Sequence, residues 1–342
     1  MTTTQQSKSK KLQTPEQMEL ELPTISIVVP NYQGGETIGG TLQSIIDQNY
    51  PKLELIVVDG GSTDNSIEII KQYEPHITWW VSEPDKGQSN AINKGFARCT
   101  GEVVNWLCSD DFLEPGALQT VGEYFASSPK VDVVVGRCRV EYMTENVGRP
   151  LKGVKYWTNL LQKFLPTGSR PIVEESDRVY IKTPTLELIN LMPASCPIHQ
   201  PSCFYRRKLL LNRDYPLIES LNHTMDIELF NYFRASGARF QVIDEILTFA
   251  PKSGVNKNCL AGVKATYELE EIYKTYTNEW IPLTYWHRKL RYPLECFLKQ
   301  HRGGIWLYLV GSLWFSITLL LAPFYGLKKV WALRWTRFVE EK

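Results

Sequence analysis

The chain lacks any excess of charge and any cysteine pattern. Its 38 Lys and Arg residues balance 37 Asp and Glu residues, which leaves a net charge of +1 and no electrostatic footprint for nucleic acid. The 7 cysteines form no Cys-x-x-Cys pair, so they predict neither a zinc finger nor a disulfide framework, and they favour a reducing compartment. Residues Met1–Pro23 contain no apolar run of the kind that a signal peptide needs. We therefore expect a disordered tail at 1–23 and activity on the cytoplasmic side of a membrane.

Glycine-rich phosphate-binding motifs are also missing. No G-x-x-x-x-G-K-[ST] sequence occurs, which excludes a P-loop, and the glycine pairs Gly34-Gly35 and Gly39-Gly40 do not make a G-x-G-x-x-G fingerprint. A nucleotide, if one is bound, must be held by other groups.

What the sequence does contain is a regular alternation of strand and helix patterns. Short β-branched runs are followed by segments with apolar residues at helical spacing. This order predicts an α/β fold with a doubly wound, mostly parallel sheet. The predicted strands are Ile25–Val29, Leu53–Val58, Thr78–Val81, Val103–Leu107 and Val131–Val135.

Carboxylates follow two of these strands. Asp59 comes after the second, and the adjacent pair Asp110-Asp111 comes after the fourth. Ligands of open α/β sheets bind beyond the carboxyl ends of the strands, so these acids are placed to hold a divalent cation against a diphosphate. Taken alone, the Asp-Asp pair is more typical of a solvated turn before a helix.

The wider motif series resembles the family 2 glycosyltransferases, a large group of inverting enzymes with the GT-A fold. The match is dense from about Ile25 to Val135, and a second cluster resembles the acceptor half of the same family. The matching segments are Ser26–Tyr32, Val57–Asp64, Ser82–Gln88, Ala91–Gly95 and Ser109–Asp111, followed by His199–Arg207 and Met225–Leu229.

The resemblance implies roles for individual residues. Asp110 and Asp111 would bind Mg²⁺ or Mn²⁺, which bridges the donor diphosphate, and Asp226 would be the catalytic base. His199 and Gln200 are expected to contact the acceptor. Contacts with the nucleotide-sugar donor are expected from Pro30, Tyr32, Asp59, Asp85, Gly87, Asn90 and Asp110. Many relatives have two consecutive acids where this chain has Asp59-Gly60, so the nucleobase stays open.

The residues around Asp226 support a base role independently. Leu229, Phe230 and Phe233 follow it at helical spacing, which places Asp226 in the first turn of an amphipathic helix. A single carboxylate there can deprotonate an incoming hydroxyl. The same position also suits an acid that only stabilises the helix dipole, and Glu228 is a rival base. Four arginines are further candidates for offsetting phosphate charge: Arg137, Arg139, Arg206 and Arg207.

The remainder of the chain is less regular. Residues Gly136–Ala194 contain five prolines and are expected to form loops and short helices that shape the acceptor pocket. Ala261–Tyr276 predicts a helix. Ile305–Leu327 has no charged residue and is long enough to cross a bilayer. Because Gly311 and Pro323 interrupt it and basic residues flank both ends, we expect a re-entrant or in-plane membrane segment, with a single span as the alternative.

The sequence thus predicts a tail at 1–23, a GT-A domain at 24–255 and a helical C-terminal region at 256–342 with its membrane segment at 305–327. The GT-A domain divides into a donor half (24–135) and an acceptor half (136–255). The predicted function is metal-dependent, inverting transfer of a sugar from a nucleoside diphosphate to a saccharide or lipid-linked acceptor, in polysaccharide or glycolipid assembly. The alternatives are a sugar-phosphate nucleotidyltransferase and an inactive membrane-bound scaffold. The expected partners are the donor, the acceptor and a membrane, with no nucleic acid.

Overall fold

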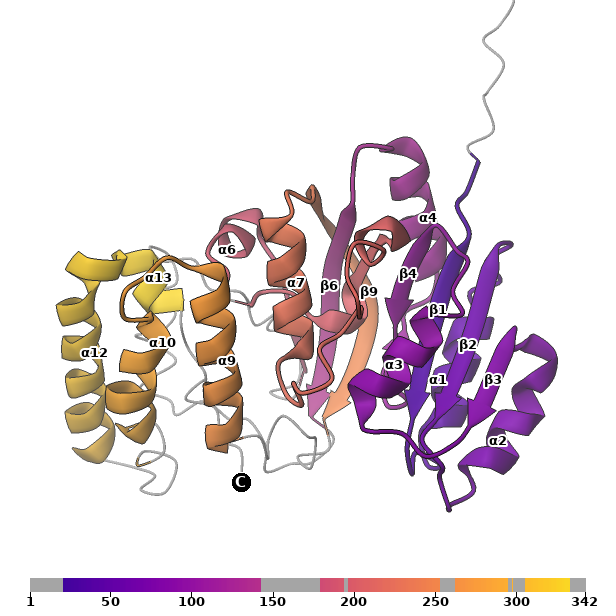
Figure 1. The fold of residues 1–342 in the computed structure, drawn as a ribbon, viewed down its shortest axis with the longest axis horizontal. Helices are drawn as coiled ribbons and strands as arrows, with labels where there is room; N and C mark the ends of the chain where they lie inside the picture. The colour runs from indigo at the N-terminus through magenta and orange to yellow at the C-terminus, as the bar shows by residue number, and fades with distance from the viewer. Residues whose placement is uncertain are drawn as a thin grey trace, which may run out of the picture.

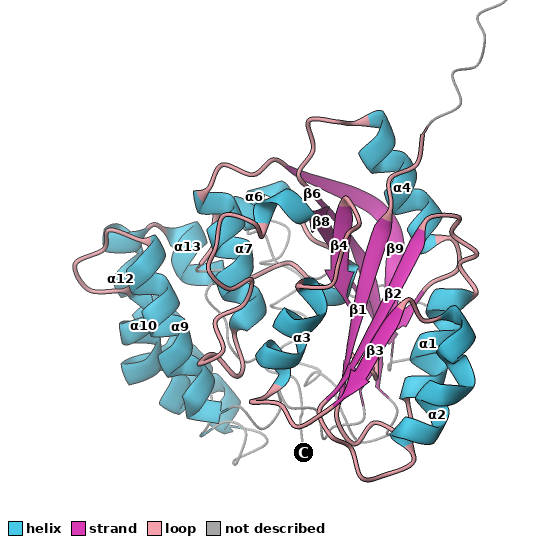
Figure 2. Cartoon of the chain, turned by 45° about the vertical axis from the view of Figure 1, so that its right-hand side comes forward, coloured by secondary structure: helices cyan, strands magenta, loops and turns pink. Residues whose placement is uncertain are grey.

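The computed structural model of the 342-residue chain describes residues 21–142, 179–193, 196–252, 262–294, 297 and 305–332. Within them, one twisted sheet has helices on both faces, and a group of C-terminal helices lies beyond one end of it (Figures 1 and 2).

Four parallel strands form the first part of the sheet, in the order β3-β2-β1-β4. Their apolar, β-branched side chains are buried because helices cover both faces. The strands are β1 (Ile25–Asn31), β2 (Leu53–Asp59), β3 (Trp79–Ser82) and β4 (Val103–Trp106). The sheet continues from β4 in the order β8-β6-β9-β5, and β7 pairs with β6. These strands are β5 (Phe112–Leu113), β6 (Val133–Tyr142), β7 (Val179–Lys182), β8 (Cys203–Arg206) and β9 (Phe240–Lys252).

The second part of the sheet mixes the two strand directions. β8 runs antiparallel to both β4 and β6, whereas β6 and β9 pair in parallel. A strand inserted between β4 and β6 makes the sheet mixed, although most of its long pairings are parallel. The mixed, mostly parallel sheet predicted from the sequence is confirmed.

The helices of the sheet domain pack on two separate apolar clusters, one on each face. α3 contributes Ile92 and Phe96 to one cluster, where Phe96 meets Trp106 edge to face at 6.0 Å between ring centroids. α1 contributes Leu42 to the other. The helices are α1 (Ile38–Ile46), α2 (Ser66–Tyr73), α3 (Gln88–Phe96), α4 (Ala117–Ser127), α6 (Leu186–Asn190) and α7 (Met225–Ala235), with short 3-10 turns at η1 (Glu74–His76), η2 (Gln200–Ser202) and η3 (Arg207–Leu209).

Part of the region expected to be loops is strand. β6 continues to Tyr142, seven residues past Val135, and pairs with β9 over most of that length. Its side chains alternate: Cys138 and Val140 are fully buried, while Arg139 between them pairs with Glu114 at 2.7 Å. Because the outward positions carry charge, the part of β6 after Val135 has no apolar run for sequence patterns to detect. Residues 143–178 of the expected loop region lie outside the described residues.

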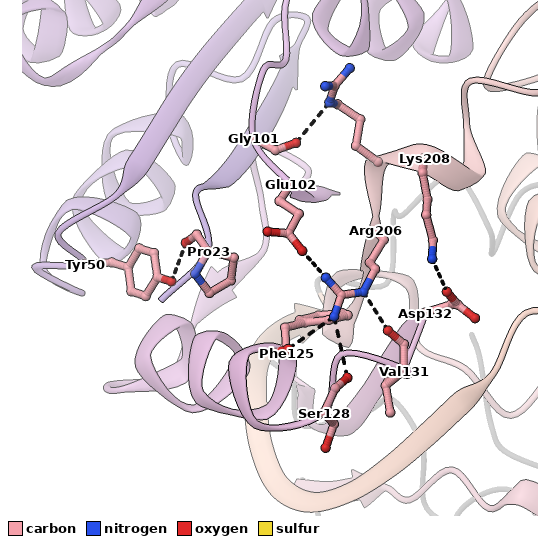
Figure 3. A network of polar contacts seen from close by, with 11 residues as sticks. Pro23, Tyr50, Gly101, Glu102, Phe125, Ser128, Val131, Asp132, Arg206 and Lys208 are labelled. Carbon is pink, nitrogen blue, oxygen red and sulfur yellow. Dashed lines mark hydrogen bonds and ion pairs between the residues drawn. The ribbon is translucent and has the colours of Figure 1, made fainter. Parts of the chain in front are cut away.

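Arg206 links β8 to α4 through hydrogen bonds near the amino ends of β1 and β4 (Figure 3). Its guanidinium donates to the carbonyl oxygens of Val131 at 2.7 Å and Phe125 at 3.1 Å and pairs with Glu102. The neighbouring Arg207 donates to the Gly101 carbonyl at 3.0 Å. Both arginines therefore lie at the opposite end of the sheet from Asp110, and the expectation that they offset phosphate charge is wrong.

The C-terminal helices form a third apolar cluster, in which Leu269 and Tyr273 pack with Leu283 and Leu321. The helix predicted at 261–276 is confirmed as α9 (Gly262–Tyr276). It is followed by α10 (Leu283–Trp286), the π-helical turn η4 (His287–Arg291), α12 (Ile305–Tyr325) and α13 (Leu327–Ala332).

Over the residues that the structure describes, no helix is both long and apolar enough to span a membrane, so the single span considered as an alternative is not found there.

Candidate functional site at the carboxyl edge of the sheet

Asp59 organises the loops that follow β1 and β2. It ends β2 directly opposite Asn31, the last residue of β1. Its Oδ1 accepts from Asn31 Nδ2 at 2.7 Å and from the Ser62 hydroxyl at 2.6 Å. Its Oδ2 accepts from the Ser82 hydroxyl at 2.7 Å and from the backbone N–H groups of Gly61 at 3.0 Å and Ser62 at 2.9 Å.

These bonds also set the ionisation of Asp59. Burial raises the pKa of its carboxyl, but the hydrogen bonds from Ser62, Ser82 and Asn31 outweigh that effect and hold the pKa below its ordinary value. The side chain is fully buried and accepts five hydrogen bonds from the chain itself. In this conformation Asp59 shapes the loop and has no surface left for a ligand.

Two residues that were predicted to contact the nucleotide-sugar donor lie next to Gly60. A Cβ added there would lie 2.5 Å from Asp85 Oδ2 and 3.3 Å from Tyr32 Cδ2. The Tyr32 side chain is 66% exposed beside it. Asp85 in turn accepts from the Gly87 N–H at 2.7 Å, and Gly87 has the positive φ of 110° that favours glycine. The structure thus brings Tyr32, Asp85 and Gly87 together around the position where many relatives have a second acid.

The Asp110-Asp111 pair lies in a turn directly after β4. The Asp111 N–H donates to the Cys108 carbonyl at 2.9 Å and closes the turn, and Thr41 of α1 donates to the Asp111 carbonyl at 2.9 Å. One ligand atom each from Cys108, Asp110 and Asp111 lies within 4.8 Å of the others. Two carboxylates and a thiol at this spacing fit a divalent cation.

The two halves of the predicted donor site meet at Cys108. Gln88, the first residue of α3, donates from Nε2 to the Cys108 sulfur at 3.2 Å. Gly34 packs beside the same turn, since a Cβ added to it would lie 2.9 Å from the Ser109 hydroxyl. The loops after β1, β2 and β4 and the start of α3 therefore converge on one edge of the sheet.

Asp226 lies in the first turn of α7, as predicted, and is partly exposed. Burial raises the pKa of Cys108 well above its ordinary value, and the negative charges of Asp111, Asp110 and Asp226 raise it further. The charge of Asp226 thus affects the turn after β4, although more than a hundred residues separate the two in sequence. The start of α3 contacts both regions, because Gln88 donates to Cys108 and the next residue, Ser89, donates to the Leu221 carbonyl at 3.2 Å. These contacts bring the segment that leads to Asp226 close to the edge of the sheet where Asp111 lies.

The rival base Glu228 is engaged elsewhere. Its carboxylate is 4% exposed and accepts both bonds of a bidentate pair with Arg213 Nη2, at 3.0 and 2.8 Å. It also accepts from the Tyr276 hydroxyl at 2.6 Å. A buried carboxylate with these partners fixes α7 against its neighbours and is poorly placed to accept a substrate proton.

Three of the residues predicted to contact ligands serve the framework in this structure. Gln200 is buried, and its amide donates to Trp106 O at 2.7 Å and to Asn105 Oδ1 at 3.1 Å, which joins η2 to β4. Pro30 is buried within β1. Asn90 donates to Glu219 Oε1 at 2.9 Å. His199 is partly exposed just before η2 and is the better placed of the two predicted acceptor residues.

Sequence reasoning missed Cys108, Gln88 and Glu219. Cys108 stands two residues before Asp110, so its proximity to the acid pair was a usable signal. Nothing in the sequence indicates that Gln88 would reach Cys108 or that Glu219 would reach Asn90, because those contacts depend on how distant segments pack.

The family model described as "Glycosyl transferase family 2" matches residues 26–210 of the chain, more than half of its length. Among curated proteins, the poly-beta-1,6-N-acetyl-D-glucosamine synthase of Staphylococcus epidermidis is 32% identical over 127 residues, 36% of this chain and 31% of that protein. The chain aligns with only about a third of the length of the first curated relatives.

Two solved structures share the fold over most of the chain. Residues 1–349 of TarS from S. aureus, in complex with UDP-GlcNAc, give a TM-score of 0.55 at 18% identity, covering 91% of this chain and 83% of that one. The mannosyltransferase PcManGT from Pyrobaculum calidifontis, in complex with GDP-Man and Mn²⁺, gives 0.53 at 16% identity, covering 92% and 86%. At these identities the likeness shows the fold alone, and the GT-A fold predicted from the sequence is confirmed.

Proposed function

The chain belongs to glycosyl transferase family 2, and from this premise we propose that it is a metal-dependent, inverting glycosyltransferase. Its donor is a nucleoside-diphosphate sugar, and its acceptor is a saccharide or a lipid-linked saccharide in polysaccharide or glycolipid assembly. One observation carries the proposal: the turn with the cation cluster and the segment that leads to Asp226 both contact the start of α3, through Gln88 and Ser89. Sugar transfer needs both a diphosphate site and a base, and these contacts support a shared site for the two.

The residues of the site have distinct tasks in this proposal. Asp110, Asp111 and Cys108 would hold a divalent cation, Mg²⁺ or Mn²⁺, which would supply positive charge to neutralise the departing diphosphate. Asp226 accepts the proton of the incoming hydroxyl, on the opposite face of the sugar from the leaving group. Attack from that face inverts the anomeric centre, as in the inverting hydrolases.

Donor recognition falls to the loops around Gly60. The exposed ring of Tyr32 and the carboxylate of Asp85 are the predicted donor groups that stand beside that glycine and can meet a nucleobase or ribose. Asp59 acts indirectly, because its five internal hydrogen bonds keep the Ser62 loop in shape. The relatives' ligands in the solved structures, UDP-GlcNAc and GDP-Man with Mn²⁺, support a nucleotide-sugar donor of this general class.

A thermal-shift panel tests the donor. UDP-GlcNAc, GDP-mannose and dTDP-glucose are each added with and without Mn²⁺. A ligand at 100 times its dissociation constant stabilises the native state by about 2.7 kcal/mol, which a melting curve resolves. We expect one donor to shift the melting temperature with Mn²⁺ and less without it. If none does, with or without metal, the inactive scaffold becomes the better account.

We further propose that the C-terminal helices attach the enzyme to the cytoplasmic face of a membrane. α12 leaves large apolar side chains in solvent, among them Leu313 at 51%, Leu320 at 71% and Phe324 at 78% exposed. Beside them, Trp280 and Leu290 help to line an apolar hollow of about 580 Å³. Exposed patches of this kind mark interaction surfaces, and an uncharged helix face suits the headgroup–acyl boundary.

Vesicle co-sedimentation tests the attachment. The wild-type protein and a Leu320→Ser/Phe324→Ser variant are mixed with phosphatidylcholine vesicles and with vesicles that also contain phosphatidylglycerol. We expect the wild type to sediment with vesicles and the variant to stay in solution with an unchanged melting temperature. Equal sedimentation of the two proteins would contradict the proposed surface.

A further inference from the structure

The segment from Leu217 to Thr224 leads directly into α7 and therefore sets where Asp226 stands. From one side it is held by α3. Asn93 of that helix donates to the Leu217 carbonyl at 2.9 Å and accepts from the Leu217 N–H at 2.8 Å. Ser89 donates to the Leu221 carbonyl at 3.2 Å. These bonds fix the beginning and middle of the segment against the donor half.

From the other side the segment is held by one carboxylate of α9. Glu268 Oε1 accepts from the Asn222 N–H at 3.0 Å. Its Oε2 accepts from the His223 N–H and from the Thr224 hydroxyl, both at 2.9 Å. A single side chain thus binds three consecutive residues, the last three before α7 begins at Met225. α9 lies beside α7 in Figure 1, and the two helices are in contact.

The arrangement meets a need at the start of α7. The first turn of a helix has N–H groups without intrahelical partners, and a capping side chain from the residue before the helix usually supplies one. Here Thr224 occupies the cap position without making that bond, and its hydroxyl points instead to Glu268. Hydrogen bonds to an ionised carboxylate are the stronger kind, and negative charge near a helix N-terminus is favourable.

A second polar contact fixes the direction of α7 relative to α9. The Tyr276 hydroxyl, two turns after Glu268 on α9, donates to Glu228 at 2.6 Å. Apolar packing lies between the two contacts, because Leu221 and Ile227 pack against the cluster that contains Leu269. α9 therefore forms hydrogen bonds both with the segment that leads into α7 and with the first turns of α7.

We propose that Glu268 is a positioning residue for the catalytic base. It holds Asn222, His223 and Thr224 so that Asp226 faces the reacting sugar, which makes α9 a working part of the site although it lies beyond the family match at 26–210. This inference rests on the proposed function, since it takes Asp226 as the base. The loss of such support displaces the base and lowers turnover without altering donor binding, and a displacement of 1 Å can cost about 100-fold in rate.

The test compares Glu268→Ala and Glu268→Gln with Glu271→Ala in the intact protein. Glu271 is a matched control because it lies on the same helix, is 70% exposed and pairs with Lys274. Nucleotide release is measured with Mn²⁺ and whichever of UDP-GlcNAc, GDP-mannose and dTDP-glucose gives the largest thermal shift. We expect Glu268→Ala to lower kcat about tenfold or more while the donor KM stays within twofold of wild type. Glu268→Gln should lower kcat less, because its side-chain carbonyl still accepts hydrogen bonds. Glu271→Ala should have the kcat and KM of the wild type.

Hydrogen–deuterium exchange supplies a readout that needs no ligand. The Asn222 and His223 amides should exchange about tenfold faster in Glu268→Ala than in Glu271→Ala, because their acceptor is gone. Equal exchange in the two variants would overturn the inference. So would a loss of kcat in Glu268→Ala that is matched by an equal loss of donor affinity, since that pattern indicates general unfolding.

The two proposals fail in different ways. If Asp226→Asn retains wild-type turnover, the assignment of the base is wrong and the proposed mechanism fails with it. If Asp226→Asn abolishes turnover while Glu268→Ala behaves like Glu271→Ala, the mechanism stands and only the role of Glu268 is refuted.

Discussion

The side-chain amide of Asn90 donates to the carboxylate of Glu219 across 2.9 Å, although the two residues are 129 positions apart. Asn90 stands in the first turn of the helix that begins at the predicted donor site, and Glu219 lies in the segment that leads to Asp226. The hydrogen bond from Asn90 holds the pKa of Glu219 below its ordinary value, so Glu219 is ionised at neutral pH. This charge-assisted bond adds to the bonds from Ser89 and Asn93 that join the donor half to the segment before the base.

Replacing Asn90 with Asp should weaken the contact between residue 90 and Glu219, because two negatively charged carboxylates would repel each other. The Asp variant loses the amide donor and places a like charge beside Glu219. Asn90→Ala loses the amide donor and the acceptor of the Lys86 N–H, but it adds no charge. We expect kcat for sugar transfer to fall further in Asn90→Asp than in Asn90→Ala. At molar salt concentration the difference in kcat between the two variants should become smaller, because salt screens charges on partly exposed groups. Identical kcat values for the two variants at low salt would contradict the prediction.

Asp226→Asn should lower sugar transfer by about 100- to 10,000-fold, the usual contribution of a general base. Donor binding, measured as the thermal shift with Mn²⁺, should be retained. Asp214→Asn is the matched control, because Asp214 is an exposed acid in the same half of the molecule. A variant that transfers sugar at the wild-type rate would remove Asp226 from the mechanism.

Changes at the cation cluster should separate metal binding from folding. Asp111→Asn is expected to abolish the part of the donor thermal shift that depends on Mn²⁺, while Glu68→Gln, on the exposed side of α2, should leave it intact. Cys108→Ser should reduce the affinity for Mn²⁺ relative to that for Mg²⁺, because a sulfur ligand favours the softer ion. Titration of each metal against the donor-induced shift measures both effects. An unchanged Mn²⁺ to Mg²⁺ ratio would exclude Cys108 as a ligand.

Asp59→Asn should make the free energy of unfolding less sensitive to acidic pH. The carboxyl pKa in the folded protein lies below its ordinary value of 3.8, so ionised Asp59 stabilises the native state above that pH, and this contribution is lost as pH falls through the folded pKa. At pH 7 the variant should lose about 1–3 kcal/mol of unfolding free energy, as for a buried acceptor whose donors lose their partner. Urea denaturation at several pH values should show a constant difference between pH 7 and 5 that shrinks below about pH 4. A difference that grew in acid would have the wrong sign.

Two helical glycines should respond in opposite ways to alanine. At Gly95 of α3 an added Cβ would lie 2.3 Å from Val28 Cγ1 in β1, so Gly95→Ala should destabilise by about 1–3 kcal/mol through overpacking. At Gly39 of α1 the nearest atom is Ile69 Cγ2 at 3.4 Å, an ordinary contact. Gly39→Ala should therefore stabilise the protein by up to the roughly 0.5–1 kcal/mol by which alanine is favoured over glycine in a helix interior, and by less than that because Gly39 lies in the first turn of α1. The denaturant midpoint of each variant measures its change in stability. A Gly95→Ala variant more stable than wild type would mean that α3 can move away from the sheet.

Local patterns determined much of this protein before any folding is considered. The apolar runs of β1, β2 and β4 and the helical spacing behind them fix the parallel half of the sheet, because a buried strand and an amphipathic helix each have a distinct period. The same logic places Asp110 and Asp111 at a strand end and Asp226 in a first helical turn, since each depends only on its neighbours in sequence.

Packing between distant segments decided the rest. Asp59 and Glu228 look like candidate ligand or base residues in the sequence, but tertiary contacts surround both with internal donors. β9 and the charged half of β6 escaped prediction because their pairing with each other makes them strands. Glu268 carries no local signal at all, and it gains a task only when α9 packs beside α7. A side chain's type follows from the sequence, but the partners that set its chemistry lie far along the chain, and only the folded structure brings them within hydrogen-bonding distance.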